Sequence, residues 1–302
     1  MPLTRGRVQP GNGYKGRVLR LFPKWTSLAV MLAATLVGCG NDPLKSAERD
    51  PLAPPRVISL SPALTRIVVA LGEQDALVGV DRFSRQLPEL SDVAELGGLF
   101  ATDLERSVQL DPTLVLAVGN REQQGYFDAL RSRGVNVEIF EGHSLDEVLE
   151  SFVRVGRLLG SEDRGRALSL QVRSKLDRIE RRAPAERATI AIVVDVEPLY
   201  VVAGGSFVNE LISIAGAENV FAALPTPYAR VGLEALAERA PDILIDTTRP
   251  AGAAGEAEQA RAHWKRFRWI QRVEFLPQGI LTLPGPDLAE ATAQLRQAVQ
   301  PR

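Results

Sequence analysis

Apolar side chains recur at three- and four-residue steps from Ser144 to Arg182, the longest stretch that reads as helix and lacks proline. The pattern predicts two helices, because Gly160 is a stop signal and Ser161 can cap the helix that follows. At ~1.5 Å per residue, the second helix would be roughly 33 Å long. Since short β-branched runs alternate with helical runs on both sides, we predict that this helix is a strut between two α/β lobes. A long surface helix within one domain is the alternative.

The chain before this stretch alternates strands and helices, which is typical of a mainly parallel sheet covered by helices. Ser61-Pro62 is a helix start, and Thr102 and Glu105 fit a capping box with the threonine at the cap. The predicted strands are Arg56–Leu60, Ala76–Val80, Leu114–Val118 and Val135–Phe140, and the predicted helices are Ser61–Gly72, Thr102–Leu110 and Gln123–Arg133.

The chain after the strut repeats this plan. Ser206 can cap a helix that ends before Gly216, which is a C-terminal stop signal. The predicted strands are Ile190–Val194, Tyr200–Val202, Ile243–Ile245 and Ile280–Leu283, and the predicted helices are Ser206–Ala215, Leu233–Ala240, Glu256–Ile270 and Asp287–Val299.

One motif occurs in both halves with equal spacing. Glu105 is followed seven residues later by Pro112 and then by an apolar run, and Glu234 is followed in the same way by Pro241. Each glutamate lies in the first turn of a short predicted helix, where the helix dipole favours an anion. Both could therefore be simple capping residues, or they could be a matched pair with a function.

The N-terminus has the features of an export signal. Basic residues precede the first acidic residue, Asp42, and the apolar run Leu28–Val37 has the size of a signal-peptide core but is short for a membrane span. The run ends in Gly38-Cys39, which resembles the lipobox of bacterial lipoproteins. That resemblance implies that residues 1–38 are removed, that Cys39 is lipidated, and that residues 39–55 form a tether. A chance cysteine after an apolar core helix is the alternative.

Composition excludes several other classes of function. The 302 residues carry a formal net charge of −1, so no basic field suggests nucleic acid as a partner. The single cysteine, Cys39, cannot form an internal disulfide. The two histidines, His143 and His263, are far apart and belong to no cluster with metal-ligand spacing, so we expect no metal site held by the protein alone. Both are expected to be surface residues.

These features together resemble a family, the periplasmic substrate-binding proteins of ABC importers that have a helical backbone between their lobes. Vitamin B12-binding, ferric siderophore-binding and haem-binding proteins belong to it. The resemblance covers roughly Arg56 to Val299 and is specific for the family but weak for the ligand. It is carried by Arg56–Pro62, Leu71-Gly72 with Val78–Val80, Leu104–Arg106 with Asp111-Pro112, Glu234 with Pro241-Asp242, His263-Trp264, and Leu283–Pro286.

The resemblance implies an α/β fold of two lobes with mainly parallel sheets flanked by helices and joined by one long backbone helix. The lobes would be residues 56–160 and 185–302, with the backbone helix at 161–184. It implies a monomer held at the membrane only by the lipid on Cys39, outside the cytoplasm, which delivers a large metal chelate to an ABC permease. Glu105 and Glu234 would face arginines on the two halves of that permease.

The ligand would lie in the cleft between the lobes, against loops at the carboxyl ends of strands. The candidate ligand-binding residues are Ser61, Phe83, Leu99, Phe100, Tyr200, Gly204, Ser206 and Tyr228. Vitamin B12-binding members have a tryptophan near Leu99, and Asp287 stands where a basic residue is common, so cobalamin, ferric siderophore and haem all stay open. Cobalamin or another corrinoid is our first expectation, and Tyr200 and Tyr228 are candidate axial ligands if the cargo is haem.

Two other classes of protein are weaker alternatives. A serine hydrolase would need a histidine beside a nucleophilic serine, and Gly204-Gly205-Ser206 lacks the later glycine of the usual elbow. We therefore assign no catalytic residue and no cofactor, and we do not expect an enzyme. A structural or adhesion lipoprotein would need no cleft between lobes.

Overall fold

In the computed structural model of the protein, residues 53–98, 101–119, 121–248, 261–277 and 279–301 are described, all within the compact unit Pro51–Arg302. The predicted lipidation site, Cys39, and two of the candidate ligand contacts, Leu99 and Phe100, lie outside the described residues. Among the described residues, no helix combines the length and the apolar character that a membrane span requires.

The first lobe is built on a five-stranded sheet in which every neighbouring pair is parallel. Its central strands are fully or almost fully buried, which explains why they read as continuous apolar runs and not as alternating patterns. In spatial order the strands are β3 (Ala94–Glu95), β2 (Leu77–Val80), β1 (Val57–Ser59), β6 (Leu114–Val118) and β7 (Asn136–Phe140), and a separate antiparallel pair is formed by β4 (Gly97–Gly98) and β5 (Ala101–Thr102).

The helices of this lobe follow the expected plan closely. Gly72 and Gly134 have φ angles of 72° and 80°, left-handed values that glycine adopts readily and that end the helices before them. The helices are α1 (Pro62–Ala70), α2 (Leu104–Gln109), α3 (Gln124–Arg131) and α4 (Leu145–Leu158), and the 3-10 turns are η1 (Gln74–Ala76), η2 (Ser84–Gln86), η3 (Pro88–Leu90) and η4 (Arg121–Gln123).

The second lobe has a mixed sheet. The pairs of β8 with β12, β12 with β13 and β8 with β10 are parallel, whereas β9 pairs antiparallel with both β8 and β11. The strands are β8 (Ala188–Val196), β9 (Leu199–Val202), β10 (Ala217–Asn219), β11 (Tyr228–Arg230), β12 (Ile243–Asp246) and β13 (Arg272–Phe275), and the helices are α6 (Phe207–Ala215), α7 (Leu233–Arg239) and α9 (Leu288–Val299).

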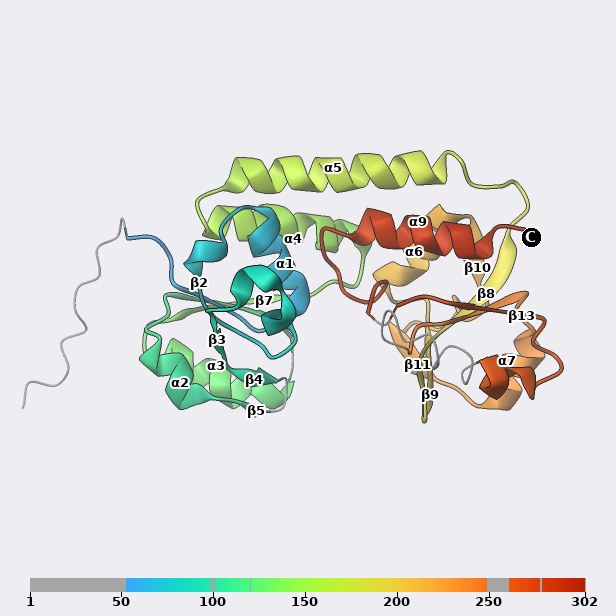
Figure 1. Ribbon diagram of the computed structural model, residues 1–302, viewed down its shortest axis with the longest axis horizontal. Coiled ribbons are helices and arrows are strands. Elements are labelled where there is room, and N and C mark those ends of the chain that lie inside the picture. Colours follow the sequence, from blue (N-terminus) through green and yellow to red (C-terminus); the bar gives the residue numbers. More distant parts are fainter. Residues whose placement is uncertain (1–52, 99–100, 120, 249–260, 278, 302) are drawn as a thin grey trace, which may run out of the picture. The chain divides into compact units, whose positions relative to one another are not determined.

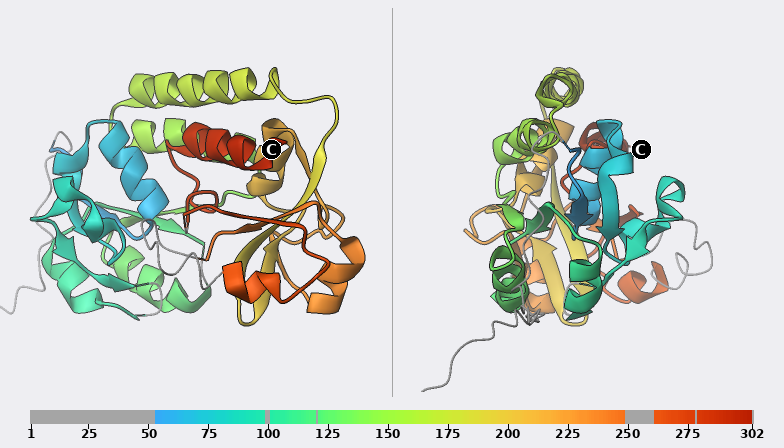
Figure 2. Two further views of the ribbon diagram at one scale, coloured as in Figure 1. Left: turned by 45° about the vertical axis from the view of Figure 1, so that its right-hand side comes forward. Right: turned by 90° about the vertical axis from the view of Figure 1, so that its left-hand side faces the viewer.

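The predicted strut is α5 (Glu162–Glu180), which runs along the outer side of α4 from the first lobe and of α9 from the second (Figures 1 and 2). Beneath it a single apolar core joins the lobes. That core includes Val57 of β1, Phe152 of α4, Val172 of α5, Ile190 of β8 and Leu295 of α9, each at most 1% exposed. Because the two sheets share this core, the lobes are joined by packed side chains as well as by the chain itself.

On its other face, each sheet packs against a second apolar core that belongs to its own lobe alone. In the first lobe it is centred on Phe127 and Val115, and in the second on Phe221 and Trp264. The indole nitrogen of Trp264 donates a hydrogen bond of 2.8 Å to Asp246, whose carboxylate is 1% exposed at the carboxyl end of β12. The buried carboxylate is thus satisfied by its partner, as burial requires.

Some local predictions are wrong. Asp103, and not Thr102, caps α2, since its carboxylate accepts a 2.9 Å hydrogen bond from the amide of Arg106. The segment predicted as the strand Ile280–Leu283 is a turn, and β13 lies earlier, at Arg272–Phe275, with every residue only partly buried. Apolar periodicity favoured the wrong run because β13 carries two charged residues. The helix predicted at Glu256–Ile270 is seen at 261–265 and has ended before Ile270, while residues 249–260 lie outside the described part.

Candidate functional site

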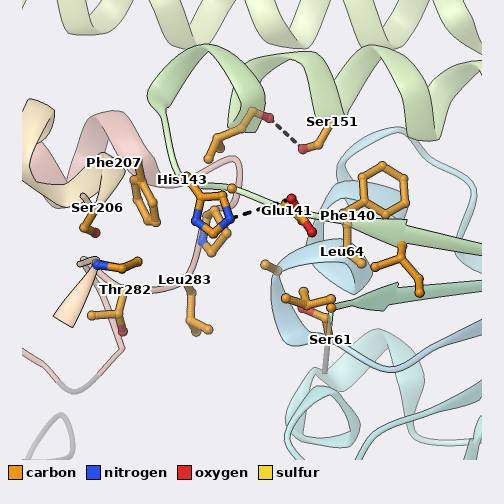
Figure 3. Close-up of a pocket in the computed structure, with 18 of the residues that line it drawn as sticks. Ser61, Leu64, Phe140, Glu141, His143, Ser151, Ser206, Phe207, Thr282 and Leu283 are labelled. Atoms are coloured by element: carbon orange, nitrogen blue, oxygen red, sulfur yellow. Dashed lines mark hydrogen bonds and ion pairs between the residues drawn. The ribbon is translucent and has the colours of Figure 1, made fainter. Parts of the chain in front are cut away.

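A cavity of about 690 Å³ lies between the two lobes (Figure 3). The first lobe contributes loops at the carboxyl ends of its parallel strands, and the second contributes the loop after β9, the start of β11 and the segment Thr282 to Pro284. Ligands of open α/β sheets bind at such strand ends, and the volume is within the range of small-molecule sites. The lining residues come from both halves of the chain: Ser61, Ala63, Leu64, Val118, Gly119, Arg121, Gln124, Ile139, Phe140, Glu141, Gly142, His143, Val148, Ser151, Ser206, Phe207, Pro227, Tyr228, Thr282, Leu283 and Pro284.

The wall from the first lobe begins at Ser61, the residue between β1 and α1. Ser61 is 6% exposed and has the extended backbone of an N-cap, although its side chain makes no capping hydrogen bond. Behind it, a buried chain of hydroxyls joins Ser59, Thr65 and Ser84, with Oγ1 of Thr65 2.8 Å from Oγ of Ser59 and 2.9 Å from Oγ of Ser84. This series of hydroxyl contacts ends at the buried carboxylate of Asp81, which Ser84 also contacts. This network fixes the loops that carry the wall.

The wall from the second lobe begins at Ser206, which caps α6 by accepting a 3.2 Å hydrogen bond from the amide of Val208. Tyr228 of β11 lies beside it. Burial raises the pKa of the Tyr228 phenol, an effect that hydrogen bonding to Ser206 partly opposes. The phenol is therefore kept neutral and held against Ser206, so it offers the cavity an aromatic face with a fixed hydroxyl.

Gly204 shapes this wall from behind. A Cβ on Gly204 would lie 1.9 Å from the carbonyl oxygen of Ala222, so no larger residue fits there without moving the backbone. The amide of Gly204 donates to the carbonyl of Leu224 at 2.9 Å. The backbone at Gly204 therefore lies close against the backbone of Ala222 and Leu224, and this contact positions Ser206.

The roof of the cavity is the segment Glu141 to Ser144, between β7 and α4. The backbone amide of His143 donates to the carboxylate of Glu147 at 2.9 Å, and the amide of Leu145 donates to Glu210 of α6 at 2.8 Å. The roof is thus tied to α4 on one side and to the second lobe on the other. The imidazole of His143 lines the cavity with 61% of its side chain exposed, and its Nε2 lies 3.7 Å from Oε2 of Glu141 (Figure 3).

The lining is mostly apolar, with scattered neutral polar groups and few charges. Apart from the imidazole of His143, the charged or ionisable groups at physiological pH among the described lining residues are Arg121 and Glu141. Hydroxyls and one amide supply the remaining polar contacts, from Ser61, Ser151, Ser206, Tyr228, Thr282 and Gln124. Such a surface suits a bulky ligand of low net charge that carries many hydrogen-bonding groups.

The structure brings three of the eight candidate ligand-binding residues, Ser61, Ser206 and Tyr228, to the cavity. Phe83, Tyr200 and Gly204 do not line it. Phe83 is 59% exposed after the carboxyl end of β2, so its contact with a ligand stays a prediction, as does that of Tyr200. Leu99 and Phe100 lie outside the described residues.

Asp287 does not line the cavity between the lobes. Its carboxylate accepts a 3.0 Å hydrogen bond from Arg66 of α1, and it lines a different hollow of about 450 Å³. An acid at this position would disfavour an anionic ligand only if it faced the ligand, so Asp287 does not narrow the choice of cargo for this cavity. Arg66 and Asp287 instead form a salt bridge between helices of the two lobes.

Sequence reasoning missed the roof and the segment Arg121 to Gln124. These residues follow the carboxyl ends of β7 and β6, so the strand-end rule that selected Ser61 would also have found them. His143 was expected at the surface. Its side chain is exposed, as expected, but the surface that it lies on is the lining of the cavity. His263 is half-buried, with its ring edge-on to Trp264 at 4.9 Å between centroids. No group of three or more potential metal-binding side chains occurs in the described part of the chain.

The two candidate docking glutamates lie on α2 and α7, and both are exposed. Both helices lie on the side of the body away from α5 (Figure 1). The repeated motif is also repeated in backbone geometry. Asp111 and Ala240, each directly before the motif's proline, have φ angles of 47° and 41°, and among the described residues no other non-glycine residue has a positive φ.

Comparison with known proteins agrees with this geometry. The sequence pattern of the periplasmic binding protein family matches residues 57–266. An uncharacterized ABC transporter substrate-binding lipoprotein, YvrC of Bacillus subtilis (strain 168), is 27% identical over 259 residues, covering 82% of this chain and 81% of that protein. A vitamin B12-binding protein of Yersinia pestis (strain Pestoides F) is 26% identical over 250 residues, covering 82% and 83%.

A solved structure shares the fold. The periplasmic haem-binding protein RhuT from Roseiflexus sp. RS-1 superposes with a TM-score of 0.67 at 24% identity, covering 82% of this chain and 98% of that one. The family pattern extends over more than half of the chain, across both lobes and the strut that joins them. The protein therefore belongs to the periplasmic binding protein family.

Proposed function

We propose that the protein is the lipid-anchored substrate-binding component of an ABC importer, with lobes 56–160 and 185–302. It captures a large metal chelate, a corrinoid in the first place, in the cavity between the lobes and delivers it to the permease. The observation that carries the proposal is the cavity itself, which is walled by both lobes and suits a bulky ligand of low net charge. The family's members are binding proteins of transport systems, which fits the expectation that this chain is not an enzyme.

The choice of a corrinoid follows from charge and hydrogen bonding. A corrinoid carries many neutral amide side chains on its ring, whereas haem carries two carboxylates and many ferric siderophores are anionic. The cavity has one arginine against one glutamate and many neutral donors and acceptors. The vitamin B12-binding relative supports the same choice. Haem is the second candidate, because Tyr228 lines the cavity and a haem-binding protein shares the fold.

A thermal-shift screen of the mature soluble domain against cyanocobalamin, cobinamide, haemin and ferric siderophores tests the proposal. A ligand present at about 100 times its dissociation constant should add about 2.7 kcal/mol to the free energy of unfolding. We expect cobinamide and cyanocobalamin to raise the melting temperature. A rise in melting temperature with haemin or a siderophore alone would mean that this compound, and not a corrinoid, is the cargo. No rise with any of the compounds would contradict a metal-chelate cargo.

Tyr228→Ala should weaken binding of the corrinoid at least about tenfold, equivalent to about 1.4 kcal/mol. The aromatic face that lines the cavity is lost, together with the hydroxyl held by Ser206. Tyr228→Phe is the matched control, because it keeps the aromatic face and removes only the hydroxyl engaged with Ser206. Isothermal titration should show a change of less than about threefold for the control. Equal losses in the two variants would contradict the assignment of this wall.

Cys39→Ser should move the protein from the membrane fraction to the soluble fraction. Each buried methylene of a lipid chain contributes about 0.8 kcal/mol, so several acyl chains on Cys39 would anchor the protein stably. Fractionation with immunoblotting, and mass spectrometry of the wild-type N-terminus, measure the change. An unmodified wild-type Cys39, or a variant that stays in the membrane fraction, would contradict the anchor.

A further inference from the structure

We propose that His143 binds the cobalt of the corrinoid directly, as an axial ligand supplied by the roof of the cleft. The inference rests on the proposed function, because it concerns the metal of the same cargo. Both walls of the cavity contact the corrin ring, and His143 would add a coordinate bond from the protein to the cobalt. The corrinoid it concerns is one whose cobalt has an open or water-occupied axial position, such as a cobinamide.

The position of His143 is the first argument. Its imidazole hangs from the segment between β7 and α4, with Ser61 and Leu64 on one side and Ser206 and Leu283 on the other (Figure 3). A flat chelate that touches both walls and faces the roof therefore places its centre, where the metal lies, beneath this ring.

The surroundings of the ring are the second argument. The backbone amide of His143 is held by Glu147 at 2.9 Å, so the residue is anchored at the start of α4. Glu141 lies on the Nε2 side of the ring at 3.7 Å, and within the described part of the chain no group hydrogen-bonds to Nδ1. A carboxylate beside one ring nitrogen, with the other nitrogen left for the metal, is the common arrangement around metal-binding histidines.

The other possible donors at the cavity are the third argument. The described residues hold no group of three or more metal-binding side chains, so the cleft does not suit a bare ion. A single imidazole suits a chelate that fills the remaining positions of the metal itself. Tyr228 is less suited, because burial raises the pKa of its phenol and its hydroxyl is engaged with Ser206. His143 is thus the best placed nitrogen donor of the described lining.

Electron paramagnetic resonance of the protein with cob(II)inamide tests the inference. We expect the cobalt lines of the wild-type complex to be split into triplets by one nitrogen-14 donor, and into doublets when the protein contains histidine labelled with nitrogen-15 in the ring. The chain has two histidines, so two variants assign the donor. His143→Ala should abolish the splitting, and His263→Ala should keep it, since His263 does not line the cavity.

Affinity gives an independent reading. In diaquocobinamide the imidazole displaces one coordinated water, which leaves to solvent. His143→Ala should therefore weaken binding about tenfold or more, because the bond from nitrogen to cobalt cannot form. Dicyanocobinamide has both axial positions blocked, so its affinity should be nearly equal for the variant and the wild type. Thermal unfolding of the free variant shows whether it folds, and the isotope labelling needs no variant at all.

The failures of the two proposals are distinguishable. Cobinamide bound without nitrogen splitting, or with splitting that persists in His143→Ala, would overturn the axial ligand and leave the corrinoid importer standing. A wild-type protein that binds no cobinamide would overturn the corrinoid assignment, and the axial ligand with it.

Discussion

Reversing both docking glutamates, Glu105→Arg with Glu234→Arg, should abolish uptake of cobalamin by cells while the purified protein keeps its affinity for the ligand. Both side chains are exposed, one on α2 and one on α7. Neither lines the cavity between the lobes, so ligand binding is not touched directly. Opposite charges on two docking surfaces speed the encounter of the proteins and fix how they align. Like charges placed face to face make the free energy of binding less favourable by several kcal/mol. Two reversals at the two ends of one surface should therefore prevent productive docking.

Uptake of labelled cyanocobalamin by cells that express the protein with its permease measures the effect. The matched control is Glu180→Arg with Glu186→Arg, which changes the net charge by the same amount. Glu180 is the last residue of α5 and Glu186 lies in the loop after it, and both are exposed. Helix α5 lies on the side of the body away from α2 and α7 (Figure 1). The control should transport normally. Normal uptake by the docking variant, or equal losses in the docking and control variants, would remove the docking assignment.

The parts of the fold that sequence reasoning predicted are those where local signals and burial agree. Strand β6 was found at its observed bounds because all but its last residue are buried, which leaves a continuous apolar run. The start of the strut followed from Gly160, whose φ of 75° is the left-handed value that stops α4, whereas the strut ends at Glu180, four residues before the predicted end. The repeat of Glu105 and Glu234 was visible because both copies keep the same spacing to a proline, and the backbone repeats it at Asp111 and Ala240.

Two of the parts that failed depend on contacts between distant segments, and one depends on a choice between two neighbouring residues. Strand β13 carries Arg272 and Glu274, which pair with each other at 2.8 Å, and nothing local shows that its partner is β12. The true cap of α2 is Asp103, one residue after the threonine that the capping-box pattern selected. His143 follows the carboxyl end of β7, so the strand-end rule would have selected it, but only the fold shows that the wall beginning at Ser206 lies across the cleft from that strand.

The apolar core beneath α5 packs against the sheets of both lobes and so helps to fix the distance between the two walls of the cavity. A hydrogen bond between Leu145 and Glu210 and a salt bridge between Arg66 and Asp287 also join the halves, but the first is only partly buried and the second is exposed. Exposed ion pairs contribute little to stability. The apolar core beneath α5, in which Phe152 is completely buried, is therefore the main link between the lobes.

Phe152→Ala should lower the free energy of unfolding by about 3–5 kcal/mol, because truncating a buried aromatic residue loses its transfer free energy and leaves a cavity. For a unit of this size the melting temperature should fall by about 2–4 °C for each kcal/mol. The control is Leu170→Ala on α5, where the side chain is 70% exposed, and it should change stability by less than about 0.5 kcal/mol.

Calorimetry of Phe152→Ala also tests whether the lobes unfold together. Since Phe152 packs in a core that includes Val57 of the first sheet and Ile190 of the second, the variant should still show one transition at a lower temperature. Two separated transitions in the wild-type protein would mean that the lobes are independent domains joined by a linker. A single transition means that the width of the cleft is set by the packing beneath α5, so that a ligand meets walls whose spacing is already fixed.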